Sequence, residues 1–297
     1  MTIEFNRRRA LTGLLALGAL TACGRAAADP LLLDIGAVST LEHRHGARIG
    51  LFAVDLSSGA EVANRPAERF AMCSTFKAYA AARVLQMVDQ GKLTLDAVVP
   101  VVAADIVANS PVTSFRVGGE MTLRELCEAA LTRSDNAAGN LLLRAIGGPS
   151  EITAFARTIG DRDSRLDRWE TDLNSAHPGD LRDTTTPQAL CGGYRELLAG
   201  SALRASGREM LEKWMRATET SNKRFRAALP AGWTSADKTG AGAYGSTNDA
   251  GLLIGPDGQR VVAAVLTRSL QDREDAGPLD GAIADSVRLT LAMLGHG

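Results

Sequence analysis

A hydroxyl and an amine lie three residues apart in the segment RFAMCSTFKAYAAARVLQMVDQG, which covers residues 69–91. Apolar residues recur in it at helical spacing, so a buried helix over residues 74–90 that stops at Gly91 is predicted. Ser74 and Lys77 would share one face of this helix. A serine hydroxyl is a weak nucleophile that needs a neighbouring base, and an amine can supply one. A lone S-x-x-K pattern also arises by chance, and its simpler interpretation is a helix cap beside a solvated lysine.

Two further short motifs follow along the chain. SDN, residues 134–136, stands between two predicted helices, and KTG, residues 238–240, stands in a predicted strand. The chain has 5 lysines against 28 arginines, and two of the five lysines fall inside these patterns. Lysine is the cation whose pKa shifts readily on burial, so its use here calls for a reason. S-x-x-K, S-D-N and K-T-G together are the signature of class A β-lactamases and penicillin-binding proteins.

The chain resembles the class A serine β-lactamases from about residue 34 to its last predicted helix. The resemblance includes the segment RWETDLN, in which Glu170 and Asn174 match the family pattern E-x-x-L-N, and the segment RDTTTP after it. It implies an Ω-loop over about residues 165–183 that is closed by a salt bridge between Arg168 and Asp183. The long stretch without periodicity between residues 161 and 185 would then be this loop.

The resemblance also implies roles for the site residues. Ser74 would attack the lactam carbonyl, with either Lys77 or, through a water molecule, Glu170 as the base for acylation. The backbone N–H groups of Ser74 and Ala241 would bind the oxyanion, and Ser134 would pass a proton to the leaving nitrogen. The substrate-binding residues that the resemblance implies are Asn136, Asn174, Lys238, Thr239, Arg224 and Asn109.

Two of these positions depart from the common family pattern. Many relatives carry an arginine on the strand after KTG, where this chain has Thr247, and Arg224 stands where other relatives place a substitute arginine. The alternative interpretation of Arg224 is a plain surface arginine. Asn109 replaces an aromatic residue that often lies at the mouth of the site. The sequence therefore leaves the preference among penicillins, cephalosporins and carbapenems open.

Cysteine and histidine usage argues against a metal site. The four cysteines, Cys23, Cys73, Cys127 and Cys191, show no clustered spacing, which argues against a disulfide framework and against a cysteine-based zinc site. Cys73 and Cys127 match halves of two disulfides of relatives, but Gly242 and Ala81 stand at the partner positions, so neither bridge can form. His43 and His45 are interpreted as a solvated pair on an extended segment. No cofactor and no metal are expected.

The N-terminal segment NRRRALTGLLALGALTAC, which ends at Cys23, is predicted to be an export signal. It has a basic start and an apolar stretch too short to span a bilayer. Its paired arginines resemble a twin-arginine signal, and the residues before Cys23 resemble a lipobox that would place a lipid on that cysteine. The alternative is an ordinary signal cut after Ala28. The mature protein is expected in the periplasm or cell envelope, with such a lipid as its only attachment to the membrane.

Composition and element order predict the architecture. Hydrophobic content of 45% and charged content of 23% are ordinary for a globular protein, and a net charge of −1 gives no electrostatic case for nucleic acid. Strand patterns near both ends flank a helical middle, which predicts an α/β fold with an inserted all-α domain. One antiparallel sheet built from both chain ends would be flanked by helices, as in the three-layer β-lactamase/D,D-peptidase-like fold. The expected division is an export signal (1–22), a linker (23–33), an α/β domain (34–64 and 225–297) and a helical domain (65–224).

The function implied by the resemblance is hydrolysis of the β-lactam amide through an acyl-enzyme on Ser74, which would give antibiotic resistance. The expected ligands are β-lactam substrates and β-lactamase inhibitors, bound by a monomer. One alternative is a D,D-peptidase or penicillin-binding protein acting on peptidoglycan, which lacks a placed general base for hydrolysing its acyl-enzyme, so Glu170 and Asn174 favour the hydrolase. Another is a β-lactam sensor domain that is acylated once and not released. Many turnovers per active site would exclude both alternatives.

Overall fold

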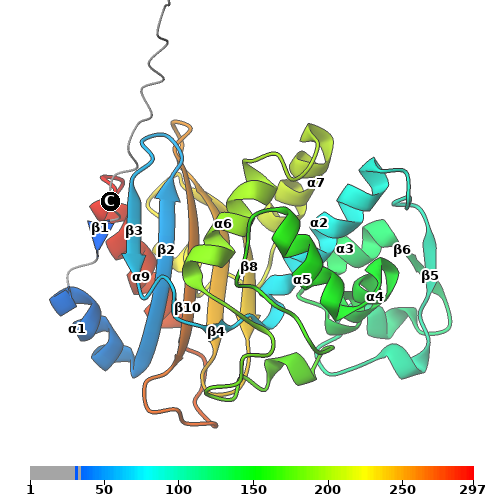
Figure 1. The fold of residues 1–297 in the computed structure, drawn as a ribbon, viewed down its shortest axis with the longest axis horizontal. Coiled ribbons are helices and arrows are strands. Elements are labelled where there is room, and N and C mark those ends of the chain that lie inside the picture. The colour runs from blue at the N-terminus through cyan, green and yellow to red at the C-terminus, as the bar shows by residue number, and fades with distance from the viewer. Residues whose placement is uncertain (1–30, 33–34) are drawn as a thin grey trace, which may run out of the picture.

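The computed structural model describes residues 31–32 and 35–297 and centres on a six-stranded sheet with the order β1-β3-β2-β10-β9-β8 (Figure 1). Strands from the two ends of the chain meet where β2 pairs with β10, which confirms the predicted sheet built from both ends. The strands of this sheet are β1 (Leu31–Leu32), β2 (Ala47–Asp55), β3 (Glu61–Asn64), β8 (Thr234–Ala241), β9 (Thr247–Ile254) and β10 (Arg260–Ser269).

Helices cover both faces of the sheet, which gives the three-layer arrangement (Figure 1). On one face lie α1 (Ile35–His45), α8 (Phe225–Ala228) and α9 (Asp280–Met293). On the other face lies α6 (Pro187–Leu198), with the helical part of the chain beyond it. Because both faces are covered, the central strands are apolar along most of their length rather than alternating.

The helical part is built around α2 (Phe76–Asp89), which is buried along most of its first three turns. It packs against the other helices of this part, α3 (Leu123–Thr132), α4 (Asn136–Ile146), α5 (Pro149–Thr158) and α7 (Ala205–Arg216). The helix predicted over residues 74–90 begins as a 3₁₀ turn, η1 (Cys73–Thr75), and continues as α2. This turn joins the helical part to the end of strand β8.

The structure corrects several details of the sequence analysis. The sheet is not wholly antiparallel, because β1 pairs in parallel with β3, and Leu31–Leu32 therefore belong to the sheet rather than to a linker. His43 and His45 lie on helix α1 and not on an extended segment, and the partly buried His45 places Nε2 2.8 Å from Asp285 Oδ2. Two short strand pairs were not predicted, β4 (Phe70–Ala71) with β7 (Thr184–Thr185) and β5 (Val98–Pro100) with β6 (Glu120–Thr122).

Cys73, Cys127 and Cys191 are buried and free, as expected from the missing partner positions. The predicted export signal, Cys23 and Ala28 lie outside the described residues. Within residues 31–32 and 35–297, no helix combines the length and the apolar character needed to cross a membrane.

Candidate active site

Three polar groups converge where η1 meets α2. Ser74 lies in the 3₁₀ turn and Lys77 in the first turn of α2, and both side chains are buried. Lys77 Nζ donates to Ser74 Oγ at 3.0 Å and lies 2.9 Å from Glu170 Oε1. Ser74 Oγ in turn donates to Glu170 Oε1 at 3.2 Å. The hydroxyl predicted to be the nucleophile therefore touches both groups predicted as its base.

Helix α4 and the residues just before it supply further contacts of Lys77. Lys77 Nζ lies 2.6 Å from Asn136 Oδ1 and 2.9 Å from the carbonyl oxygen of Ser134. A Cβ at Gly139 would lie 2.8 Å from Lys77 Cε, so glycine at that position makes room for the lysine. Burial lowers the pKa of Lys77, and the carboxylate of Glu170 opposes this effect. The pKa falls below the ordinary lysine value, which makes the neutral amine more accessible.

Glu170 is held by the Ω-loop and by α4. Asn174, in the 3₁₀ turn η4 (Asp172–Asn174), donates Nδ2–H to Glu170 Oε2 at 2.5 Å. Asn140 accepts from the backbone N–H of Glu170 and donates to its carbonyl oxygen, each at 2.9 Å. The peptide bond between Glu170 and Thr171 is cis. Sequence analysis missed Asn140, because only the fold brings it next to the loop.

The two ends of the Ω-loop are joined by Arg168 and Asp183, as the sequence predicted. Arg168 Nε donates to Asp183 Oδ2 at 2.6 Å. The other oxygen of this fully buried carboxylate accepts from the backbone N–H groups of Asp167 and Arg168. A charge-assisted pair that also receives backbone donors is well suited to fix a loop.

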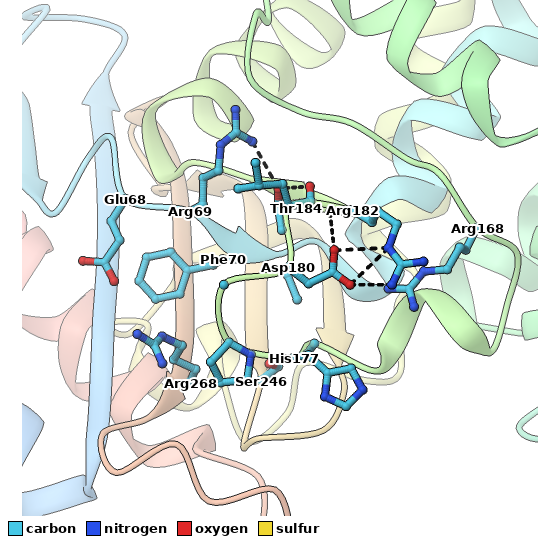
Figure 2. A pocket seen from close by; sticks show the side chains of 15 residues that line it. Glu68, Arg69, Phe70, Arg168, His177, Asp180, Arg182, Thr184, Ser246 and Arg268 are labelled. Carbon is cyan, nitrogen blue, oxygen red and sulfur yellow. Dashed lines mark hydrogen bonds and ion pairs between the residues drawn. The ribbon is translucent and has the colours of Figure 1, made fainter.

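A cavity of about 280 Å³ lies between the Ω-loop and strands β4 and β7 (Figure 2). Four arginines line it, and each is paired with a carboxylate. The pairs are Arg69–Asp163, Arg168–Asp183, Arg182–Asp180 and Arg268–Asp272. Because these charges are already balanced within the protein, the cavity offers no free cation to a ligand, and we assign it no role in catalysis.

The SDN and KTG motifs meet across the site. Lys238 Nζ donates to Ser134 Oγ at 3.0 Å and to the carbonyl oxygen of Thr239 at 2.7 Å. Burial lowers the pKa of Lys238 strongly, and the neighbouring Lys77 lowers it further. Asp135, the middle residue of SDN, caps α4 by accepting from the N–H of Ala138 and also accepts from the loop that begins at Val112. Its function is therefore to position the motif.

Eight of the predicted catalytic and substrate-binding residues line one cavity of about 380 Å³ between the helical part and the end of β8. Thr220, which lines this cavity too, was missed by sequence analysis; its hydroxyl lies 2.6 Å from that of Thr239. Lys77, Glu170 and Lys238 stand behind the cavity wall and contact the residues that form it. The lining residues are Ser74, Asn109, Ser134, Asn136, Asn174, Thr220, Arg224, Thr239, Gly240 and Ala241.

Arg224 is buried and is not a surface arginine. Its Nε donates to Asp280 Oδ1 at 2.7 Å, and Nη1 donates to the carbonyl oxygens of Gly240 and Asn248 at 2.8 Å. These bonds use Nε and Nη1 and hold the guanidinium group at the cavity wall. Asn109 is exposed at the cavity mouth, where its Nδ2 donates to the carbonyl oxygen of Ser134 at 3.3 Å.

Comparisons with known proteins agree with this geometry. A model of the Beta-lactamase enzyme family matches residues 35–290. The chain is 46% identical to Beta-lactamase AST-1 of Nocardia asteroides, over 98% of this chain and 96% of the relative. It is 44% identical to the carbapenem-hydrolyzing beta-lactamase KPC of Klebsiella oxytoca, over 86% of this chain and 87% of the relative.

Solved structures give the same result for the fold. The crystal structure of the beta-lactamase from Desulfarculus baarsii matches with a TM-score of 0.85 and 42% identity, over 88% of this chain and 97% of that one. An ancestral class A beta-lactamase of Gram-negative bacteria matches with a TM-score of 0.83 and 48% identity, over 87% of this chain and 98% of that one. The chain therefore belongs to the class A serine β-lactamases and hydrolyses the β-lactam amide of penicillins and related antibiotics through a serine acyl-enzyme.

Proposed function

We propose that Ser74 is the residue that carries the acyl group. The observation that supports this most is the position of its hydroxyl, 3.0 Å from Lys77 Nζ and 3.2 Å from Glu170 Oε1, at the wall of the cavity. In acylation the Oγ–C bond forms, the lactam C–N bond breaks, and the hydroxyl proton passes to the base. Both candidate bases lie within reach of the hydroxyl, so either Lys77 or Glu170 can accept its proton during acylation.

Ser134 is the proposed proton donor to the leaving nitrogen. Its Oγ accepts from Lys238, so the hydroxyl proton is available for donation into the cavity. Asn136 and Asn109 are neighbours in the cavity wall, since the backbone N–H of Asn136 donates to the carbonyl oxygen of Asn109 at 2.9 Å, and there they can bind the side chain of the substrate. The N–H groups of Ser74 and Ala241 would stabilise the negative oxygen of the tetrahedral intermediate.

Deacylation is assigned to Glu170 and Asn174. Glu170 Oε2 accepts from Asn174 Nδ2, and Asn174 Oδ1 is buried with no hydrogen-bond partner among the described residues. A water molecule that donates to Asn174 Oδ1 would lie beside the Glu170 carboxylate. That carboxylate would take its proton as the water oxygen attacks the ester carbon and the bond to Ser74 Oγ breaks.

The substrate carboxylate would bind between Lys238, Thr239, Thr220 and Arg224. Arg224→Ala is expected to raise KM for a penicillin by about tenfold or more, because a hydrogen bond to a charged group contributes about 1.5–3 kcal/mol. Steady-state kinetics measure this, with circular dichroism as the check on folding. Lys223→Ala removes the exposed cation next to it and should leave KM unchanged. Unchanged kinetics in Arg224→Ala would show that Arg224 does not bind the substrate and only makes its contacts with Asp280 and the two carbonyl oxygens.

The experiment that tests catalytic turnover at this site counts turnovers per active site. Purified protein is mixed with an excess of benzylpenicillin, and the loss of the β-lactam absorbance is followed. Many turnovers per protein molecule are expected. A stop after one equivalent would support the sensor alternative, and slow release together with cleavage of D-alanyl-D-alanine peptides would support the D,D-peptidase.

We also propose that the chain is exported by the twin-arginine route, carries a lipid on Cys23 and acts as a monomer with the predicted domain division. Replacing Arg8 and Arg9 with lysine should leave the protein in the cytoplasm, because the signal depends on the arginine pair. Cys23→Ala should release it from the membrane fraction. Cell fractionation followed by mass spectrometry of the mature N-terminus measures both. A mature chain that begins at Asp29 would contradict lipidation.

A further inference from the structure

Two carboxyl groups lie side by side on the sheet, next to the strand position of Lys238. Asp237 of β8 stands opposite Gly251, and Asp249 of β9 stands opposite Thr239, so the two aspartates are diagonal neighbours on one face. Side chains alternate along a strand, which places Lys238 on the other face. Both aspartates are fully buried. They line neither of the cavities described above, and the reaction steps proposed above do not use them.

The hydrogen bonds of the pair are incomplete when both carboxyl groups are ionised. Asp249 Oδ2 accepts from Ser221 Oγ at 2.8 Å and from the backbone N–H of Phe225 at 3.2 Å. Asp249 Oδ1 and both oxygens of Asp237 have no well-aligned donor among the described residues, although the hydroxyl groups of Ser235 and Ser221 lie near Asp237. The strand register places the Asp249 carboxyl group diagonally beside that of Asp237. A proton on Asp249 Oδ1 would supply Asp237 with a donor and leave Oδ2 free for its two existing partners.

Electrostatics favour the same arrangement. Two adjacent buried carboxylates repel each other, and one of them is expected to bind a proton. Burial raises the pKa of both groups, and the neighbouring Asp237 raises the pKa of Asp249 further. The proton is therefore expected mainly on Asp249, and one negative charge stays on the pair.

That charge acts on Lys238. Burial, Lys77 and Arg224 all lower the pKa of Lys238, whereas Asp249 and Asp237 raise it. The other groups that face the aspartates are Arg224, Arg226, Tyr194, Ser221 and Ser235. The aspartate pair thus opposes the effect of two cations and of burial on the pKa of Lys238.

We propose that Asp237 and Asp249 share a single proton, and that the one negative charge left on the pair keeps the Lys238 ammonium group protonated for binding of the substrate carboxylate. The two aspartates are positioning residues, because they act on the substrate only through Lys238. The part that concerns substrate rests on the proposed function of Lys238, whereas the shared proton does not.

The first experiment measures KM and kcat for a penicillin across pH in wild type, Asp237→Asn, Asp249→Asn and the double variant. Asparagine resembles a protonated aspartate in shape and can donate to the remaining carboxylate, so each single variant keeps one negative charge. The rise of KM at high pH, where Lys238 loses its proton, should stay at the wild-type pH in both single variants. In the double variant it should move down by about one pH unit or more, because the compensating charge is gone.

The control is Asp55→Asn, which removes a buried carboxylate from β2 of the same sheet, where it pairs with His296. Its KM profile should not move, and thermal melts of all variants identify any loss of folding. Single variants that each shift the profile by about half as much as the double variant would overturn the proposal, since a pair with two charges loses one charge in each single variant and both in the double. A double variant with the wild-type profile would overturn the action on Lys238.

The second experiment observes the proton without substrate. The infrared spectrum of wild type at neutral pH should show the C=O stretching band of a protonated carboxyl group, which an ionised carboxylate does not show. This band should be absent from Asp249→Asn, so it should appear in the difference spectrum between the two proteins. The band should also be absent from Asp237→Asn, where Asp249 ionises, and should persist in Asp55→Asn. Absence of the band from wild type would overturn the shared proton even if Lys238 binds the substrate as proposed.

Discussion

The variant Glu170→Ala is expected to be acylated on Ser74 and to accumulate as the acyl-enzyme. Deacylation should be slowed by about 10²–10⁴-fold, the usual contribution of a general base. Acylation persists because Lys77 Nζ still reaches Ser74 Oγ at 3.0 Å. Deacylation requires a base for the attacking water, and in this site the Glu170 carboxylate beside Asn174 is the group placed to act on it. Quenched-flow kinetics with benzylpenicillin should show a burst of one equivalent followed by a very slow steady state.

The matched control is Asp172→Ala, which removes an exposed carboxylate from η4, the turn of the Ω-loop that follows Glu170. It should keep wild-type turnover, which would separate the chemistry of Glu170 from damage to the loop. Turnover by Glu170→Ala at the wild-type rate would contradict its assignment as the deacylation base. Loss of the burst as well would mean that Glu170 is also required for acylation, and the route through Lys77 would then be wrong.

The variant Lys77→Ala is expected to acylate about 10²–10⁴-fold more slowly than wild type, since alanine cannot accept a proton from Ser74. The substitution also leaves Glu170 buried without its cation, and breaking a buried ion pair costs about 3–5 kcal/mol. A lower melting temperature is therefore expected together with the kinetic defect. Single-turnover kinetics measure the first effect and calorimetry the second.

Lys213→Ala is the control for this variant, because Lys213 is exposed on α7 and away from the cavity residues. It should change neither acylation nor melting temperature. An acylation rate within tenfold of wild type in Lys77→Ala would exclude the amine as the acylation base and would leave the route through Glu170.

The chemistry of the site could be predicted from the sequence because most of the reacting residues belong to short sequence motifs. Helical spacing placed Ser74 and Lys77 on one face, and the structure brings their polar atoms to 3.0 Å. Residues that support these groups carry no local signal. Asn140 clamps the backbone of Glu170 and Gly139 makes room for Lys77, yet each looks like an ordinary position of α4 in the sequence. Such contacts arise only when distant segments pack together.

Secondary structure was predicted best where the apolar period is strong and worst where tertiary contacts decide. Helix α1 was missed because its residues show little periodicity. Glu42 anchors it by accepting from the backbone N–H of Ile49 and pairing with Arg65. The β4–β7 pair likewise joins residues more than a hundred positions apart in the chain. A two-residue strand has too few side chains to show an alternating pattern.

The most direct test of the account is to find where the drug is attached. Glu170→Ala is mixed with benzylpenicillin, and the intact protein and its peptides are weighed by mass spectrometry. The account predicts one added drug mass that persists for minutes or longer and maps to Ser74, with no adduct in a Ser74→Ala/Glu170→Ala control. An adduct on any other residue, or an adduct that persists in the control, would contradict the central claim that this chain hydrolyses β-lactams through Ser74.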